Sequence, residues 1–181
     1  MKVTFKKLQK KLIISLVMLV SGMMIPSALY AQNAEQIMPL LKGYEWKLQP
    51  EQFQNLGEDT DLVLMEIAAD TSLMNAFRFR ALEALKLFEK DRVADFLETY
   101  LEQNQSSSHL RRAFEAFSKG FSGTQPDRVQ QVARKLLLHS NPHVRISAAR
   151  TLRTLDTSSA RSAYRTHLDT EEEWVRKAIE Q

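Results

Sequence analysis

The sequence predicts an all-α protein, a short solenoid of stacked helices, and two observations carry this prediction. Apolar residues recur at helical spacing, and one short segment recurs at a nearly constant interval. The segment holds an apolar residue, an Arg, two variable residues and a small or apolar residue. Its four copies begin at Phe77, Leu110, Val144 and Val175. A repeat with a period of about 33 residues is typical of proteins in which each unit stacks on its neighbours.

A second recurring element, an amphipathic run, lies between the copies. In one example, Val129, Val132 and Leu136 lie three and four positions apart, and this spacing places them on one face of a helix. None of the runs alternates as a half-buried strand does. Segments and runs together predict about nine or ten short helices in antiparallel pairs. The four runs cover residues 61–70, 92–104, 128–141 and 159–169.

Several residues mark where these helices begin. Asn141 offers a capping side chain directly before Pro142, and proline is favoured at the first helical position. The three acids at 171–173 suit a first turn because negative charge is stabilised at the positive end of the helix dipole. We therefore expect helices to start near residues 126, 142, 158 and 170.

The third repeat carries a family pattern in seven residues: Asn141, Pro142, Val144, Arg145, Ala148, Ala149 and Leu152. A turn with Asn-Pro, then Val-Arg, an Ala pair and a Leu resembles the HEAT-repeat family, in particular the short bacterial HEAT-like repeats first recognised in phycobilisome lyases. The fourth repeat matches moderately, and the first two depart from the pattern because Phe stands where Val and Ala are usual. The resemblance covers roughly residues 61–181. It implies a right-handed α-solenoid of about 3.5 HEAT-like helix pairs, with residues 32–60 as an N-terminal helical cap.

The resemblance also implies a structural role for the repeat arginines. In the family, the repeat Arg commonly pairs with the turn acid of a neighbouring repeat, and a partly buried guanidinium needs such a partner. By this resemblance, four arginines are expected to hold the repeats together: Arg78, Arg111, Arg145 and Arg176.

The N-terminal segment, residues 1–31, has the pattern of a secretory signal peptide. Residues 2–11 carry five lysines and no acid, residues 12–25 carry no charge, and a tail of mostly small residues follows. These are the three regions of such a peptide. We expect cleavage after Ala31 and export to the periplasm or the medium. Cleavage after Ala28 stays open, because Leu29 stands where a small residue is usual.

An uncleaved membrane anchor is the alternative interpretation of this leader. Residues 12–31 are twenty mostly apolar residues, about the length that crosses a bilayer. Pro26 interrupts the stretch near its end, which favours a cleaved peptide.

Charge is distributed unevenly along the chain. The sequence holds 25 Lys and Arg against 22 Asp and Glu, but five bases and no acid lie in residues 1–31, so the remainder has a net charge of −2. Overall basicity therefore gives no support to nucleic-acid binding. Residues 32–104 have a net charge of −7 and residues 105–181 a net charge of +5. This polarity also allows head-to-tail self-association.

The basic half suggests a partner-binding surface. Arg134 and Arg165 stand at equivalent places on successive runs, so they should stack as neighbours, with Lys135 and Arg161 nearby. Second helices usually line the concave face of HEAT-like arrays, so the resemblance implies a basic groove for an acidic protein partner. Solvated surface charge is the alternative. Trp174 is expected either to pack backward within a terminal cap or to anchor another protein.

No catalytic residue, cofactor or metal site is predicted. The sequence has no Cys, which excludes disulfides and thiolate chemistry. His139 and His143 have the spacing of metal ligands on a helix, but the Asn141-Pro142 turn separates them. Ser106–Ser108 lacks the glycine elbow of a nucleophile and is interpreted as a helix cap.

We therefore expect an exported, non-enzymatic adaptor or scaffold that binds another protein. A membrane-tethered structural envelope protein is the alternative if the leader is retained. The resemblance adds an enzymatic alternative, because some HEAT-like proteins are chromophore lyases or DNA glycosylases. Export would separate this protein from both kinds of substrate.

Overall fold

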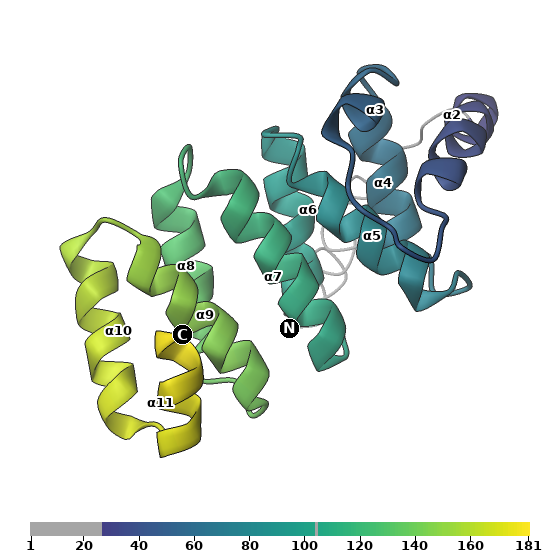
Figure 1. Cartoon of the computed structure of the whole chain (residues 1–181). Helices are drawn as coiled ribbons and strands as arrows, with labels where there is room; N and C mark the ends of the chain where they lie inside the picture. Colours follow the sequence, from purple (N-terminus) through teal and green to yellow (C-terminus); the bar gives the residue numbers. More distant parts are fainter. Residues whose placement is uncertain (1–26, 104) are drawn as a thin grey trace, which may run out of the picture.

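Ten helices and no strand make up the part of the chain that the computed structural model describes, residues 27–103 and 105–181 (Figure 1). This confirms the predicted all-α class. Residues 1–26 of the predicted leader lie outside the described residues, and residues 27–31 belong to the first helix. The helices are α2 (Ser27–Leu40), α3 (Pro50–Gln54), α4 (Thr60–Ala69), α5 (Asn75–Leu85), α6 (Asp91–Glu102), α7 (Ser107–Phe121), α8 (Pro126–Leu136), α9 (Pro142–Thr154), α10 (Ser158–Thr170) and α11 (Glu173–Glu180).

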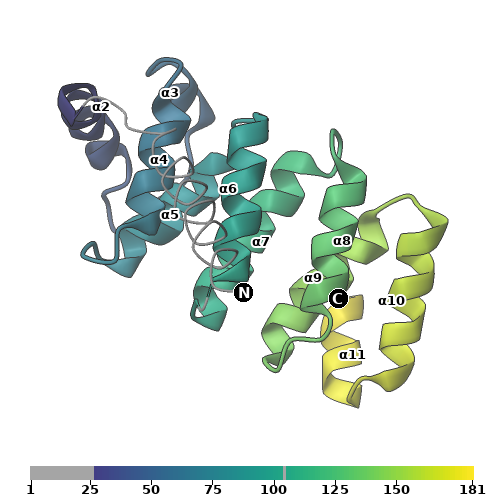
Figure 2. The ribbon, with the colours of Figure 1, turned by 180° about the vertical axis from the view of Figure 1, so that it is seen from behind.

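The helices from α4 onward pack in two layers. We call α5, α7, α9 and α11 the front layer, because they pack side by side and face the viewer in Figure 1. We call α4, α6, α8 and α10 the back layer, which Figure 2 shows from the opposite side. Each back-layer helix packs against a helix of the front layer. α2 packs against α4, at the end of the molecule opposite α11.

Capping side chains mark the start of three helices, α7, α9 and α10. The side chain of Asn141 accepts a hydrogen bond from the backbone N–H of His143 at 2.9 Å, and α9 starts at Pro142. Thr157 caps α10 in the same way, because a side-chain oxygen satisfies an N–H that the first helical turn leaves free. The predicted start near residue 170 is wrong: Thr170 ends α10, and α11 begins at Glu173.

The core lies between the two layers. Leu82, Phe114 and Leu152 of the front layer are completely buried, as are Leu97 and Val129 of the back layer. Burial of a side chain of this size stabilises the fold by about 1.5–3 kcal/mol. Within the front layer, small side chains at the contact points let neighbouring helices approach closely; Ala81, Ala113 and Ala148 are completely buried.

The helix caps define the register of the front layer. Its N-cap residues Met74, Ser106, Asn141 and Glu172 recur once in each repeat, and the longest of the three intervals separates Ser106 from Asn141. The residue seven positions after each cap is completely buried: Ala81, Ala113, Ala148 and Ile179.

This register corrects one predicted equivalence. Counted from its cap, His109 takes the place of Val144, and Leu110 takes the place of Arg145. The alignment of Leu110-Arg111 with Val144-Arg145 is therefore one residue out of step. Arg111 lies one position beyond the other repeat arginines, turned about 100° around the helix.

Gly120 allows the close contact between α7 and the end of α5. A Cβ atom at this position would lie 3.2 Å from both Cα and O of Lys86, whereas one at Gly123 would meet nothing within 4 Å. The contact is therefore one of backbone against backbone, and only a residue without a side chain fits it unchanged.

We expect Gly120→Val to force α7 away from Lys86 and to destabilise the fold by about 1–3 kcal/mol, the usual cost of overpacking. Gly123→Val is the matched control, because the space around Gly123 is open. Thermal unfolding followed by circular dichroism measures both. Equal melting temperatures for the two variants would contradict this account of the α5–α7 contact.

Candidate protein-interaction surfaces

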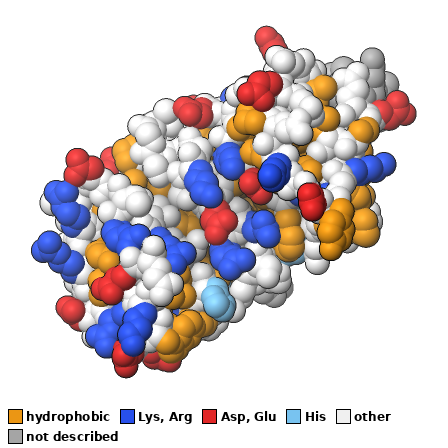
Figure 3. Space-filling model, in the orientation of Figure 1, with side chains coloured by type: hydrophobic (Ala, Val, Ile, Leu, Met, Phe, Trp, Pro, Cys, Tyr) orange, Lys and Arg blue, Asp and Glu red, His pale blue; other side chains and the backbone are white. Residues whose placement is uncertain are grey.

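The two layers differ in charge. The front-layer helices hold ten Lys and Arg against four Asp and Glu, and the back-layer helices hold six against eight. Helix α9 has three arginines and no acid at all. Figure 3 shows Lys and Arg side chains along the face formed by α7, α9 and α11. Positive charge therefore concentrates on one side of the molecule as well as in its C-terminal half.

In the back layer, bases reach from one helix to acids of the preceding helix. The carboxylate of Asp61, on α4, has no exposed surface. Lys90 and Arg92, at the start of α6, both donate hydrogen bonds to its Oδ1 at 2.8 Å. Burial raises the pKa of Asp61, but the bonds from Arg92 and Lys90 outweigh burial and hold the pKa below its ordinary value. A buried carboxylate is thus fully paired.

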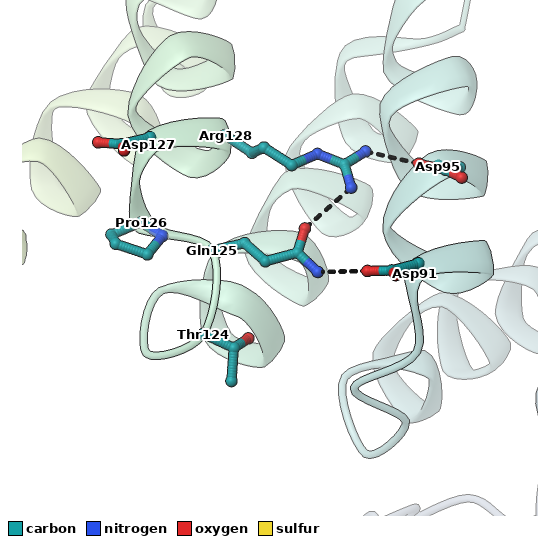
Figure 4. Close-up of a pocket in the computed structure, with 7 residues that line it drawn as sticks. All are labelled: Asp91, Asp95, Thr124, Gln125, Pro126, Asp127 and Arg128. Carbon is teal, nitrogen blue, oxygen red and sulfur yellow. Dashed lines mark hydrogen bonds and ion pairs between the residues drawn. The ribbon is translucent and has the colours of Figure 1, made fainter.

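The next contact of this kind lines an open depression of about 630 Å³ between α6 and α8. Figure 4 shows Arg128 reaching from α8 to Asp95, with Gln125 between Arg128 and Asp91. Arg128 donates to Asp95 at 2.7 Å and to both oxygens of Glu98 at 2.8 and 3.0 Å. Arg128, Gln125, Asp95 and Asp91 are thus joined in one hydrogen-bonded chain, whereas Asp127 lines the same depression with an exposed side chain.

The predicted basic residues of the back layer have different partners. Arg134 donates hydrogen bonds to the backbone O and Oγ of Ser159, at 2.9 and 2.6 Å. Ser159 therefore lies beside Arg134, whereas Arg165 follows six residues later on α10, about 9 Å along the helix axis. Lys135 pairs with Glu102 at 3.1 Å, and Arg161 pairs with Asp156 at 2.7 Å. Arg165 is exposed.

Trp174 stands at the start of α11 with 47 % of its surface exposed. Its indole Nε1 donates to Glu172 at 2.8 Å. Its ring meets the ring of His143 edge-on, with 6.2 Å between the centroids. The side chain is thus held in place with about half of it open to solvent.

Behind Trp174, Arg145 joins three segments. It forms a bidentate pair with Glu171, in the turn before α11, and donates to the backbone oxygens of His139 and Ser140 at 3.0 and 3.1 Å. The Arg145 hydrogen bonds lower the pKa of Glu171 despite its burial. The expected pairing of a repeat Arg with a turn acid is confirmed here. Nε2 of His167 lies 2.9 Å from Oε1 of Glu171.

The other repeat arginines do not follow the expected pairing. Arg78 is buried, and its guanidinium donates to the backbone oxygen of Ala68 at 3.1 Å and to the hydroxyl of Tyr100 at 3.3 Å. Ala68 lies in the last turn of α4, where carbonyls lack partners within the helix. Arg176 is exposed on α11.

No group of three or more His, Asp and Glu side chains within the described residues is placed to hold a metal ion. Among the same residues, no helix has the length and apolar character needed to span a bilayer.

The fold and its surfaces define an all-α protein with two helix layers, of which the front layer is strongly basic. A comparison with protein-family models finds no match, and none is found among curated proteins.

Sequence reasoning missed the front layer as a candidate surface. The net charges of the two halves of the chain each include helices from both layers. Summing the charges over alternate helices instead separates the front layer from the back layer. The signal was present in residues 142–154, a predicted helix with three arginines and no acid.

We expect Arg145→Met to destabilise the fold by about 3–5 kcal/mol, because it leaves the Glu171 carboxylate buried without its partner. Lys177→Met, which breaks the exposed pair with Glu173, should cost about 0–1 kcal/mol. Urea unfolding measures both. The pairing explanation fails if the two variants are equally stable, or if adding Glu171→Gln to Arg145→Met recovers nothing.

Stability should also fall as the pH drops below about 6.5, the ordinary pKa of histidine. Burial lowers the pKa of both His109 and His167, so the folded state holds them neutral while the unfolded state takes up protons. Their contribution is present above the unfolded pKa and is lost as the pH falls from that value through the lower folded-state pKa. Melting temperatures between neutral pH and mild acid should show this decline. Replacing both histidines with Leu should flatten it, and replacing the exposed His143 with Gln should not.

Proposed function

We propose that this protein is an exported, non-enzymatic adaptor built as a right-handed α-solenoid of about 3.5 HEAT-like helix pairs, with residues 32–60 as its N-terminal cap. The order of helix contacts supports the solenoid: α5 packs on α7, α7 on α9, and α9 on α11. The recurring burial seven residues after each cap supports a repeated unit.

The observation that supports the adaptor proposal is how charged side chains are paired or left exposed on the surface. The back-layer ion pairs cross from helix to helix and join residues about one repeat apart, as in Arg92 with Asp61, Arg128 with Glu98 and Lys135 with Glu102. Such contacts stabilise the array itself. They occupy most of the charged groups between the back-layer helices, which favours exposed side chains over a pocket as the means of recognition.

Three predicted residues remain suited to contact a partner on the back layer and its C-terminal edge. Arg134 is exposed, and a neutral serine, rather than a carboxylate, orients it. Arg165 is exposed on the neighbouring helix. Trp174 is held by Glu172 with its ring half open, and partly exposed tryptophans and arginines are the residue types that contribute most to protein interfaces.

We expect Arg134→Glu combined with Arg165→Glu to abolish capture of the main partner in a crosslinking pull-down from the cell envelope with tagged protein. The charge reversal places acids against an acidic partner, and like charges across an interface cost several kcal/mol. Lys42→Glu combined with Lys47→Glu is the matched control, because both lysines are exposed near the opposite end of the molecule.

Capture of one dominant partner that only the first variant loses would support the adaptor. Unchanged capture by the Arg134 and Arg165 variant would overturn the back-layer surface. An intact mass starting near Gln32 would support export of a cleaved chain. A mass that retains residues 1–31 would favour the membrane-tethered envelope protein instead.

A further inference from the structure

Two front-layer arginines, Arg150 and Arg153, are held by neutral groups rather than by carboxylates, in contrast to Arg145 of the same helix. Arg150 donates Nε to the backbone oxygen of Ala178 at 3.1 Å and donates Nη2 to the same atom. Arg153 donates to the backbone oxygen of Glu180 at 3.0 Å. Both reach from α9 to the last turn of α11. Backbone oxygens at the end of α11 fix the two guanidinium groups and offset only part of their charge through the helix dipole.

Arg112, on α7, follows the same principle with a different neutral partner. Its guanidinium carbon lies 4.9 Å from the centroid of the Phe79 ring, an arrangement in which the ring face attracts the cation without neutralising it. Arg112 and the exposed Lys119 line a groove of about 250 Å³ between α5 and α7, next to the small side chain of Ala116.

Most back-layer bases contrast with this arrangement. Arg92, Arg128, Lys135 and Arg161 each pair with at least one Asp or Glu. Across the described residues, by contrast, no acidic side chain forms an ion pair with Arg112, Lys119, Arg150 or Arg153. Arg112, Arg150 and Arg153 therefore present positive charge that is held in position and forms no ion pair within the described residues.

We propose that this front-layer face, formed by Arg112, Lys119, Arg150 and Arg153, binds an acidic polypeptide segment of a partner protein. A guanidinium carries five N–H donors in a planar fork that matches a carboxylate, and Arg153 uses only one of them in the contact with Glu180. Because the three arginine side chains are already held by neighbours, a bound carboxylate incurs little of the entropy cost of fixing them.

The acids of this face favour a polypeptide over a nucleic acid. Glu83 and Glu115 line the same groove as Arg112 and Lys119. A nucleic-acid backbone places a negative charge at every phosphate, and some of these charges would meet the two glutamates. A polypeptide can place its carboxylates opposite the arginines and uncharged residues opposite the glutamates. The proposal rests on the adaptor function and names the chemistry of the partner.

Fluorescence anisotropy with a labelled peptide of alternating Glu and Gly tests the proposal on the protein without its leader. Arg150→Gln with Arg153→Gln removes the charge, yet a Gln amide can still donate to the backbone oxygens of α11. We expect this variant to bind the peptide about tenfold more weakly, equivalent to about 1.4 kcal/mol. Lys42→Gln with Lys47→Gln, the same loss of two charges at exposed positions near the opposite end of the molecule, should change the affinity less than about twofold. Melting temperatures check that both variants remain folded.

If Arg150→Gln with Arg153→Gln unfolds the protein, Lys119→Gln serves as the second variant, because its exposed side chain holds no other element in place. Equal weakening by the Arg150 and Arg153 variant and by the Lys42 and Lys47 variant, or no binding of the peptide, would overturn the proposal. Tighter binding of oligothymidylate than of the peptide would overturn it in favour of a nucleic-acid surface. If the peptide fails to bind while the pull-down still captures a partner, the adaptor function remains supported and only the front-layer binding face is rejected.

Discussion

Each helix of the front layer covers apolar surface of the helices before and after it, and the arrangement of the whole molecule depends on this shared burial. Ala81, Ala113 and Ala148 sit at equivalent points of the contact and are completely buried. A helix pair alone would leave its apolar stripe in water, so each pair needs the next. Side-by-side packing then fixes which side chains face outward, and those side chains form long faces rather than an enclosed cavity.

Electrostatics distinguishes these faces. Back-layer bases stabilise the array by pairing with acids about one repeat earlier in the chain, as Arg128 does with Glu98. Arg150 and Arg153 of the front layer stabilise it through uncharged atoms, the backbone oxygens of Ala178 and Glu180. Both contacts connect neighbouring helices, but only the second leaves the charge available to another molecule. Under our proposal, arginines that pair with acids serve the structure, and arginines that contact only neutral groups serve recognition.

The helical class was predictable from the sequence because apolar spacing and capping residues act locally. Pairing of Arg145 with Glu171 was predictable in kind, because a turn acid lies close to the repeat Arg of its neighbour. For Arg78, the nearby turn acid Asp70 accepts hydrogen bonds from Ser72 instead, and the guanidinium turns to the backbone of Ala68. Which partner such a side chain takes depends on competition between neighbours, and spacing alone does not show it.

The candidate surfaces were predictable only in part. Exposed bases on residues 128–141 and 159–169 follow from amphipathic spacing, but the partners of those bases depend on how far each helix is offset from the next. The segment alignment placed Arg111 with Arg145, and the longer interval between the caps Ser106 and Asn141 moves Arg111 out of step. A single-residue offset changes which side of a helix a residue occupies.

Complete burial of Asp61 has a consequence for the order in which the chain folds. Its carboxylate can leave water only when Lys90 and Arg92 are in place, since an unpaired buried charge is strongly unfavourable. Those two bases lie in the next repeat along the chain. The start of α4 therefore cannot reach its final environment before the start of α6 has formed. One carboxylate thus couples the folding of neighbouring units and makes the N-terminal part of the array fold cooperatively.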